Sequence, residues 1–206
     1  MKKLFAFLLV AAMLVSLTAC GGKDDESILG VYSEDARTYE NGFIGIGCKL
    51  DAEWDVFDTE EIAALNSLAA DMMTDEKLAE QLQNSGLIQP FFAQLEAEAL
   101  NVNITLENLG VLYGSRLSEQ EYAEKAIEQL PTALQAIGLT DITTEIGTIT
   151  FAGKEHVAIF VTGSLQGVAF YETMVCMKVG RYIASVTAGS YLSDTTADVL
   201  AMFYSL

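Results

Sequence analysis

The sequence predicts an α+β fold, with one antiparallel meander sheet and helices on both of its faces, arranged as a three-layer α/β/α sandwich. Three observations lead to this class. Four successive strand-like runs near the C-terminus are joined by short connections, as in sequential antiparallel strands. Apolar residues recur at helical spacing before and after those runs. The last strands are apolar on both faces, which indicates that both faces are covered.

The first predicted elements are a hairpin and a helix. Asn41-Gly42 fits a two-residue hairpin turn, and apolar residues alternate along 44–50 after it. Asp58 precedes Glu61 by three residues, which is the spacing of a capping box at the start of a helix. Apolar residues then recur at helical spacing, so we expect a helical region over 59–86.

The middle of the chain contains an ambiguous segment, a strand and a second helix. Residues 87–95 fit either an edge strand or a helix start, whereas alternation over 102–109 predicts a strand. Ser118 and Glu121 form a second capping box. The helix that follows contains Pro131, which should kink it or restart it.

The C-terminal part is predicted to be the meander and a closing helix. The four strands are expected over 142–151, 155–163, 167–178 and 182–189. A last helix should begin near Ser193-Asp194 and carry four apolar or aromatic residues on one side. These are Val199, Leu200, Phe203 and Tyr204.

Composition excludes two classes of partner. The chain has 206 residues, with 29 Asp and Glu against 11 Lys and Arg, so its formal net charge is −18. Binding to nucleic acid, or to anionic lipid by charge alone, requires a basic face, and we expect neither. Because 51% of the residues are apolar, the acidity does not indicate disorder, and one packed domain is expected.

The N-terminal residues have the features of an export signal. Lysines precede an apolar run over residues 4–17, which is too short to span a bilayer as a helix. The run ends in Leu17-Thr18-Ala19-Cys20, which resembles the lipobox of bacterial lipoproteins. The resemblance implies cleavage between Ala19 and Cys20 and acyl anchoring through a diacylglyceryl group on the Cys20 sulfur. A conventional signal peptide or a buried helix is the alternative.

These features divide the chain into three parts. Residues 1–19 are expected to be the signal peptide, 20–35 a tether, and 36–206 a single exported domain at the outer side of a bacterial cell membrane. Because residues 1–19 contain two lysines and no acid, the mature protein carries a formal charge of −20.

The order of elements from residue 36 to 206 resembles the PsbP-like fold. The resemblance lies in the 39–43 motif Tyr-Glu-Asn-Gly-Phe, a strand ending near Trp54, a helix, and then 102–104 Val-Asn-Ile. It continues with 118–122 Ser-Glu-Gln-Glu-Tyr opening a helix, the meander and a terminal helix. The resemblance implies a non-enzymatic role in binding or assembly, and it places no family site residue in this chain.

An acidic segment is the best place in the sequence for a cation. Asp51, Glu53, Asp55 and Asp58 supply the oxygen ligands that Ca²⁺ prefers. Their spacing does not match an EF-hand loop, and we assign no metal or cofactor. The alternative is a solvated loop whose acids stabilise a helix N-terminus.

Cys48 and Cys176 remain after lipidation of Cys20. Both lie in predicted strands, and an exported location permits a disulfide between them. Buried free thiols are the alternative.

The sequence does not contain a recognisable catalytic pattern. His156 is the only histidine and is interpreted as a strand-edge residue, and there is no G-x-S-x-G elbow. We therefore expect a membrane-anchored lipoprotein with a non-catalytic domain that binds a protein or envelope component. The alternative is an acidic lipoprotein that binds a metal ion or small ligand through residues 51–61.

Overall fold

The computed structural model describes residues 28–72, 87–110 and 116–206, which form two antiparallel sheets with helices packed on them. The small sheet has the order β1-β2-β3-β11 and the large sheet the order β4-β5-β6-β10-β9-β8-β7. The strands are β1 (Val31–Ser33), β2 (Thr38–Asn41), β3 (Ile46–Lys49), β4 (Asp55–Val56), β5 (Ile88–Leu95), β6 (Leu100–Asn108), β7 (Leu139–Phe151), β8 (Lys154–Leu165), β9 (Val168–Val179), β10 (Tyr182–Tyr191) and β11 (Phe203–Ser205). The helices are α2 (Thr59–Met72), α5 (Glu119–Ala136), α6 (Thr196–Leu200) and the short 3₁₀ helix η2 (Glu96–Glu98).

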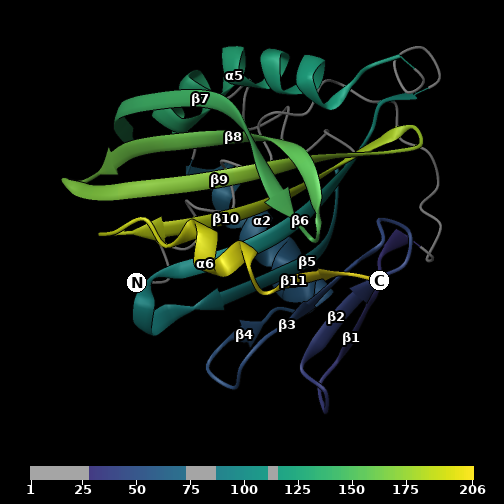
Figure 1. The fold of residues 1–206 in the computed structure, drawn as a ribbon. Helices are drawn as coiled ribbons and strands as arrows, with labels where there is room; N and C mark the ends of the chain where they lie inside the picture. Colours follow the sequence, from purple (N-terminus) through teal and green to yellow (C-terminus); the bar gives the residue numbers. More distant parts are fainter. Residues whose placement is uncertain (1–27, 73–86, 111–115) are drawn as a thin grey trace.

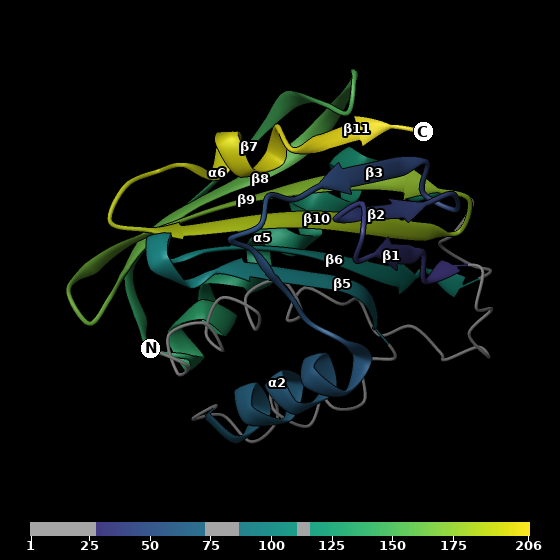
Figure 2. The same cartoon turned by 90° about the horizontal axis from the view of Figure 1, so that it is seen from below.

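The large sheet is covered on both faces (Figure 1). On one face α5 packs over β7, β8 and β9, and α2 contributes Ile62 to the same core beside β5 (Figure 2). On the other face lie the small sheet and α6, with a second core between the two sheets. The predicted antiparallel α+β fold with helices on both faces is therefore confirmed. The small sheet, which supplies most of the second outer layer, is an addition that the sequence did not predict.

The meander is formed as predicted. β7, β8, β9 and β10 pair with one another in sequence order, and each begins and ends within three residues of its predicted bounds. Two of the connections are two-residue turns with positive φ at both positions, 46° and 81° at Ala152-Gly153 and 53° and 83° at Gln166-Gly167. This is the type I′ geometry whose twist matches that of paired strands.

Both predicted capping boxes are present. The Glu61 N–H donates to Asp58 Oδ1 at 2.8 Å, and the Asp58 N–H donates to Glu61 Oε2 at 2.9 Å. Ser118 and Glu121 exchange the equivalent pair of bonds at the start of α5. The α5 helix runs through Pro131 as one helix. The segment 87–95, which the sequence left open, forms strand β5.

The predicted hairpin exists, but its turn is longer than expected. β2 and β3 are joined by residues 42–45. Within this turn, Asn41 Oδ1 accepts hydrogen bonds from the N–H groups of Phe43 (3.0 Å) and Ile44 (3.3 Å). Asn41 is itself buried and donates to the Ile28 carbonyl at 2.9 Å. The side chain of Asn41 thus shapes the turn and attaches the residues before β1.

Two boundaries differ from the prediction. The closing helix α6 ends at Leu200, and Phe203 and Tyr204 belong to β11, where Phe203 is paired with Cys48 of β3. Residues 28–35, assigned to the tether, lie in the folded domain, because β1 pairs with β2 and Ile28 is only 4% exposed. The predicted signal peptide, Ala19, Cys20 and the 73–86 part of the helical region lie outside the described residues. Among the described helices, none is long and apolar enough to cross a membrane.

Candidate functional site

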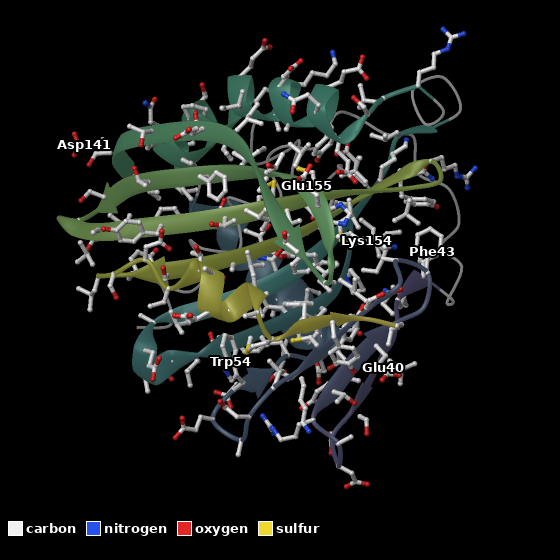
Figure 3. All side chains as sticks on the ribbon, in the orientation of Figure 1. Glu40, Phe43, Trp54, Asp141, Lys154 and Glu155 are labelled. Carbon is white, nitrogen blue, oxygen red and sulfur yellow. The ribbon has the colours of Figure 1, made fainter. Side chains whose placement is uncertain are left out.

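A cavity of about 650 Å³ lies between the large sheet and the C-terminal segment. One wall is the end of β7 with neighbouring parts of β8 and β9, and the other is α6 with β11. In Figure 3 the C-terminal end of β7 is found at Lys154, which follows the β7–β8 turn near β11. Asp141 lies at the opposite end of β7. We call this cavity the α6 cleft.

Most of the α6 cleft is apolar. Phe151 and Phe203 face each other from its two walls with ring centroids 5.3 Å apart. The half-buried Phe160 ring lies against Gly147, where an added Cβ would come within 3.0 Å of it. The remaining apolar lining comes from Ile149, Ala152, Ala197, Leu200 and Ala201.

One end of the α6 cleft is polar. Thr196, in the first turn of α6, donates its hydroxyl to Asp194 Oδ1 at 2.8 Å, and its N–H donates to the same oxygen at 3.1 Å. The Thr196 hydroxyl oxygen is then free to accept the hydrogen bond from the Thr173 hydroxyl of β9, at 2.9 Å. This chain of bonds attaches α6 to the sheet and leaves the exposed Asp194 carboxylate as an acceptor at the rim.

The two ionisable side chains in the lining of the α6 cleft, Asp194 and Tyr204, both form hydrogen bonds within the protein. Asp194 accepts the two bonds from Thr196, and the Tyr204 hydroxyl donates to Glu40 Oε1 at 3.2 Å. Desolvation raises the pKa of Tyr204, and the neighbouring Glu40 carboxylate adds to the rise. The arrangement can hold an apolar body and a polar end group.

A second feature is a row of buried polar residues on the α5 side of the large sheet. Along β6, four alternate residues point to this side and are at most 2% exposed, and these are Asn101, Asn103, Thr105 and Glu107. The register places Thr187 of β10 opposite Asn103, and Gly189 of β10 between Asn101 and Glu172 of β9. This row was not predicted from the sequence, because alternating polar and apolar residues usually indicate a strand with one solvated face.

One end of the row has hydrogen-bond partners. The Tyr122 hydroxyl of α5 donates to Glu107 Oε2 at 2.9 Å. Burial raises the pKa of Tyr122, and the Glu107 carboxylate adds to the rise. This contact joins α5 to β6 near the centre of the sheet.

At the other end of the row, eight buried polar atoms have no hydrogen-bond partner in the part of the chain that the structure describes. They belong to five residues that we call the polar floor, namely Asn101, Asn103, Glu172, Thr187 and Tyr191. Burial raises the pKa of Glu172 to about 8, so its carboxyl is mostly protonated at neutral pH. An unpartnered buried polar group costs about 1–3 kcal/mol.

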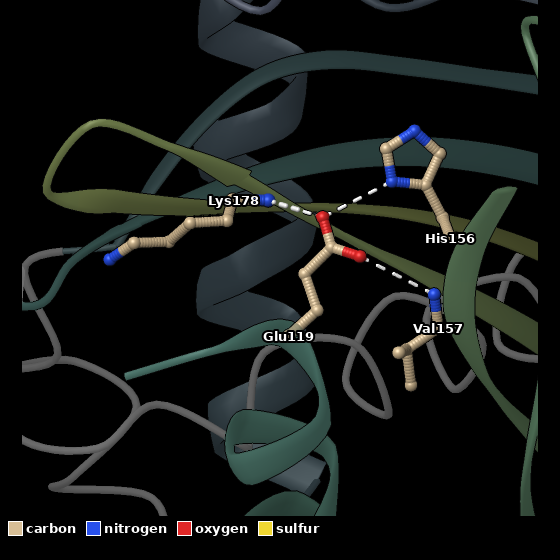
Figure 4. A network of polar contacts seen from close by, with 4 residues as sticks. All are labelled: Glu119, His156, Val157 and Lys178. Carbon is tan, nitrogen blue, oxygen red and sulfur yellow. Dashed lines mark hydrogen bonds and ion pairs between the residues drawn. The ribbon is translucent and has the colours of Figure 1, made fainter. Parts of the chain in front are cut away.

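The carboxylate of Glu119 forms a further polar network, at the point where β8 and β9 separate. The pairing of these strands ends at Val157 opposite Cys176, although both strands continue. There Glu119 Oε1 accepts a hydrogen bond from the backbone N–H of Lys178 at 2.8 Å, and Oε2 accepts one from the backbone N–H of Val157 at 3.4 Å (Figure 4). His156 Nδ1 lies 3.1 Å from Oε1. The first residue of α5 therefore replaces the missing strand partners, and His156, predicted as a strand-edge residue, supports it.

Replacing Glu119 with Ala should destabilise the protein by about 2–4 kcal/mol, because two backbone donors lose a charged acceptor. The matched control is Glu128→Ala, an exposed position on the same helix. Urea denaturation of both variants measures the difference. Equal stability of the two variants would show that the network contributes nothing beyond the loss of one surface charge.

The predicted acidic segment has local roles in the structure. Asp51 Oδ1 accepts from the Glu53 N–H at 3.1 Å, and Asp58 caps α2. Glu53 and Asp55 are exposed. Among the described residues, no group of three or more His, Cys, Asp or Glu side chains could hold a metal ion. The structure thus places Asp51 and Glu53 at a turn, Asp55 in β4 and Asp58 at the start of α2.

The disulfide that the sequence left possible is not formed. Cys48 and Cys176 are both free. Cys48 lies in the core between the two sheets, whereas Cys176 lies in the core under α5, on the other side of the large sheet. Burial raises the pKa of each thiol to about 12, so both are protonated at neutral pH.

The α6 cleft was not predicted from the sequence. Its residues come from β7, β8, β9, α6 and β11, which are brought together by packing between distant parts of the chain. The one local signal is the motif Asp194-Thr195-Thr196, in which an acid precedes a helix by two residues.

Comparison with known proteins does not assign a family. No protein-family model matches the chain, and no curated protein matches it. Among solved structures, the chain is similar to LpqN of Mycobacterium tuberculosis, described as involved in cell envelope biogenesis. The match has a TM-score of 0.39 and 8% identity, and it covers 77% of this chain and 82% of LpqN. Similarity at this level is too low to carry a function from one protein to the other.

Proposed function

We propose that the protein is an exported, lipid-anchored binding protein whose domain holds a small amphipathic molecule in the α6 cleft without transforming it. The observation that carries the proposal is the cleft itself. Its volume of about 650 Å³ lies within the range of sites for small molecules, about 300–1,000 Å³. Its lining combines apolar side chains with a few fixed polar groups, which is the usual composition of such sites.

The two ends of the α6 cleft support an amphipathic ligand. The aromatic rings of Phe151, Phe160 and Phe203 can cover an apolar body. At the polar end, the Asp194 carboxylate can accept further hydrogen bonds, since a carboxylate has about four acceptor positions and Thr196 uses two. The ligand class is therefore an apolar chain or ring system with a hydrogen-bond-donating end group.

Binding without catalysis is supported by the chemistry of the lining. The ionisable lining groups Asp194 and Tyr204 are hydrogen-bonded to Thr196 and Glu40, respectively. The Thr196 hydroxyl is buried and is also bonded to Thr173 of β9, so it attaches α6 to the sheet. The resemblance to the PsbP-like fold, which implies non-enzymatic roles, agrees with this.

Anchoring at the membrane is supported by the lipobox resemblance at Leu17-Thr18-Ala19-Cys20. The mature charge of −20 argues against attachment to anionic lipid by charge, so a lipid on Cys20 is the simpler anchor. An amphipathic component of the envelope is the natural source of a ligand for a protein in this location.

The neutral apolar dye N-phenyl-1-naphthylamine tests the cleft, because its fluorescence rises in apolar surroundings. The full chain should bind it saturably. Ala197→Trp should weaken binding by about tenfold or more, because Ala197 lines the cleft and an indole there fills it.

The matched control for the dye experiment is Asp198→Trp. It places the same ring on the same helix at an exposed position outside the lining. All samples are measured in the same detergent, so that the fluorescence of dye taken up by micelles is the same in each of them. Absence of saturable binding, or equal loss in both variants, would contradict the proposed site.

A further inference from the structure

The polar floor lies on the opposite side of the large sheet from the α6 cleft, so it is independent of the proposed function. Asn101 and Asn103 face the α5 side, whereas their neighbours Val102 and Ile104 belong to the core between the sheets. All five floor residues are at most 3% exposed. These polar groups therefore lie inside the protein, away from bulk solvent.

The geometry of the floor is compact. Thr187 lies directly opposite Asn103, and Gly189 separates Asn101 from Glu172 within one cross-strand row. Tyr191 follows Gly189 by two residues on the same side of β10, and its ring packs against Phe170 at 5.4 Å. Side chains paired in this way across antiparallel strands lie within reach of one ligand.

The unpartnered atoms include both donors and acceptors. The amide nitrogens of Asn101 and Asn103 are donors, their amide oxygens and the Glu172 carbonyl oxygen are acceptors, and the hydroxyls of Thr187 and Tyr191 can act as either. A metal ion would satisfy the oxygens and leave the amide nitrogens without partners. A molecule rich in hydroxyl groups can satisfy both kinds of atom, because each hydroxyl donates and accepts.

We propose that the polar floor is a binding site for a small, uncharged, hydroxylated molecule of the polyol or sugar class. The five residues include no basic side chain, so the floor offers no charge to an anionic ligand. The Tyr191 and Phe170 rings add an aromatic wall of the kind that packs against the C–H faces of sugars.

NMR of the full chain tests this site directly, because the side-chain NH₂ groups of Asn101 and Asn103 give their own signals. The probes are glycerol and glucose, with CaCl₂ as the cation comparison. We expect the two amide signals to shift saturably with glycerol or glucose and not with CaCl₂. Shifts with CaCl₂ alone would overturn the assignment to a hydroxylated ligand.

Two variants complete the experiment. Thr187→Val keeps the shape of the side chain and removes its hydroxyl, so it should weaken binding by about tenfold. The matched control, Thr105→Val, lies on the same side of β6 next to Asn103 but outside the floor, and it should bind like the wild type. If no probe moves the amide signals, the floor holds water only and the proposal is wrong. Equal weakening in both variants would also overturn it.

Discussion

Exchanging Glu172 for Gln is expected to stabilise the protein above pH 8 and to remove much of the stability loss that accompanies rising pH. Glu172 is 1% exposed, and neither of its carboxyl oxygens has a hydrogen-bond partner among the described residues. Burial raises its pKa from 4.5 to about 8. The folded protein therefore keeps a proton on Glu172 that the unfolded chain releases.

The sign of the effect follows from this difference in proton binding. Below pH 4.5 both states are protonated and Glu172 contributes no pH dependence. Between pH 4.5 and 8 only the folded state holds the proton, so stability falls as the pH rises, by about 1.4 kcal/mol per unit. Above pH 8 the loss is complete, at about 5 kcal/mol. A glutamine side chain at this position cannot ionise and avoids the loss.

Urea denaturation at a series of pH values measures the effect. The matched control is Glu145→Gln, which removes one carboxylate from an exposed position on β7. We expect the difference in stability between Glu172→Gln and the wild type to grow from pH 5 to pH 8, with no such growth for Glu145→Gln. A difference that stays constant with pH would show that Glu172 ionises normally in the folded protein.

The fold could be predicted where local signals determine it. The capping boxes at Asp58 and Ser118 depend on residues three positions apart, and both are present. The strands of the meander are joined by short turns, so neighbours in sequence are neighbours in the sheet. Prediction succeeded here because few long-range contacts were needed.

The C-terminal segment shows why other parts could not be predicted. Val199, Leu200 and Phe203 have the spacing of one helical face, so the sequence favours a helix that continues through Phe203. The chain instead leaves the helix after Leu200, because Phe203 pairs with Cys48 in the small sheet. That pairing joins distant segments and has no local sequence signal.

The polar floor and the α6 cleft were missed for related reasons. The polar residues of β6 alternate with Val102, Ile104 and Leu106, which resembles a strand with one face in water. Their burial follows from the cover on both sides of the sheet, which the sequence did predict. The alternation along β6 and the predicted cover on both faces of the sheet together locate the row of buried polar residues. The α6 cleft has no such signal, because it depends on packing between five elements.

Replacing Cys20 with Ala is expected to move the protein from the membrane fraction to the soluble fraction. A single acyl chain binds membranes only marginally, whereas two chains anchor a protein stably, and the diacylglyceryl group supplies two. The matched control is Thr18→Ala, which changes the variable position of the lipobox and keeps Leu17, Ala19 and Cys20.

The intact mass of the protein extracted from membranes tests the proposed lipid-anchored location most directly. We predict a chain that begins at Cys20 and carries a diacylglyceryl group, both in the wild type and in Thr18→Ala. Cys20→Ala should be found unlipidated and released from the membrane. A membrane-bound Cys20→Ala protein, or a wild-type chain that lacks the lipid mass, would contradict the proposed anchor and the location of the binding domain.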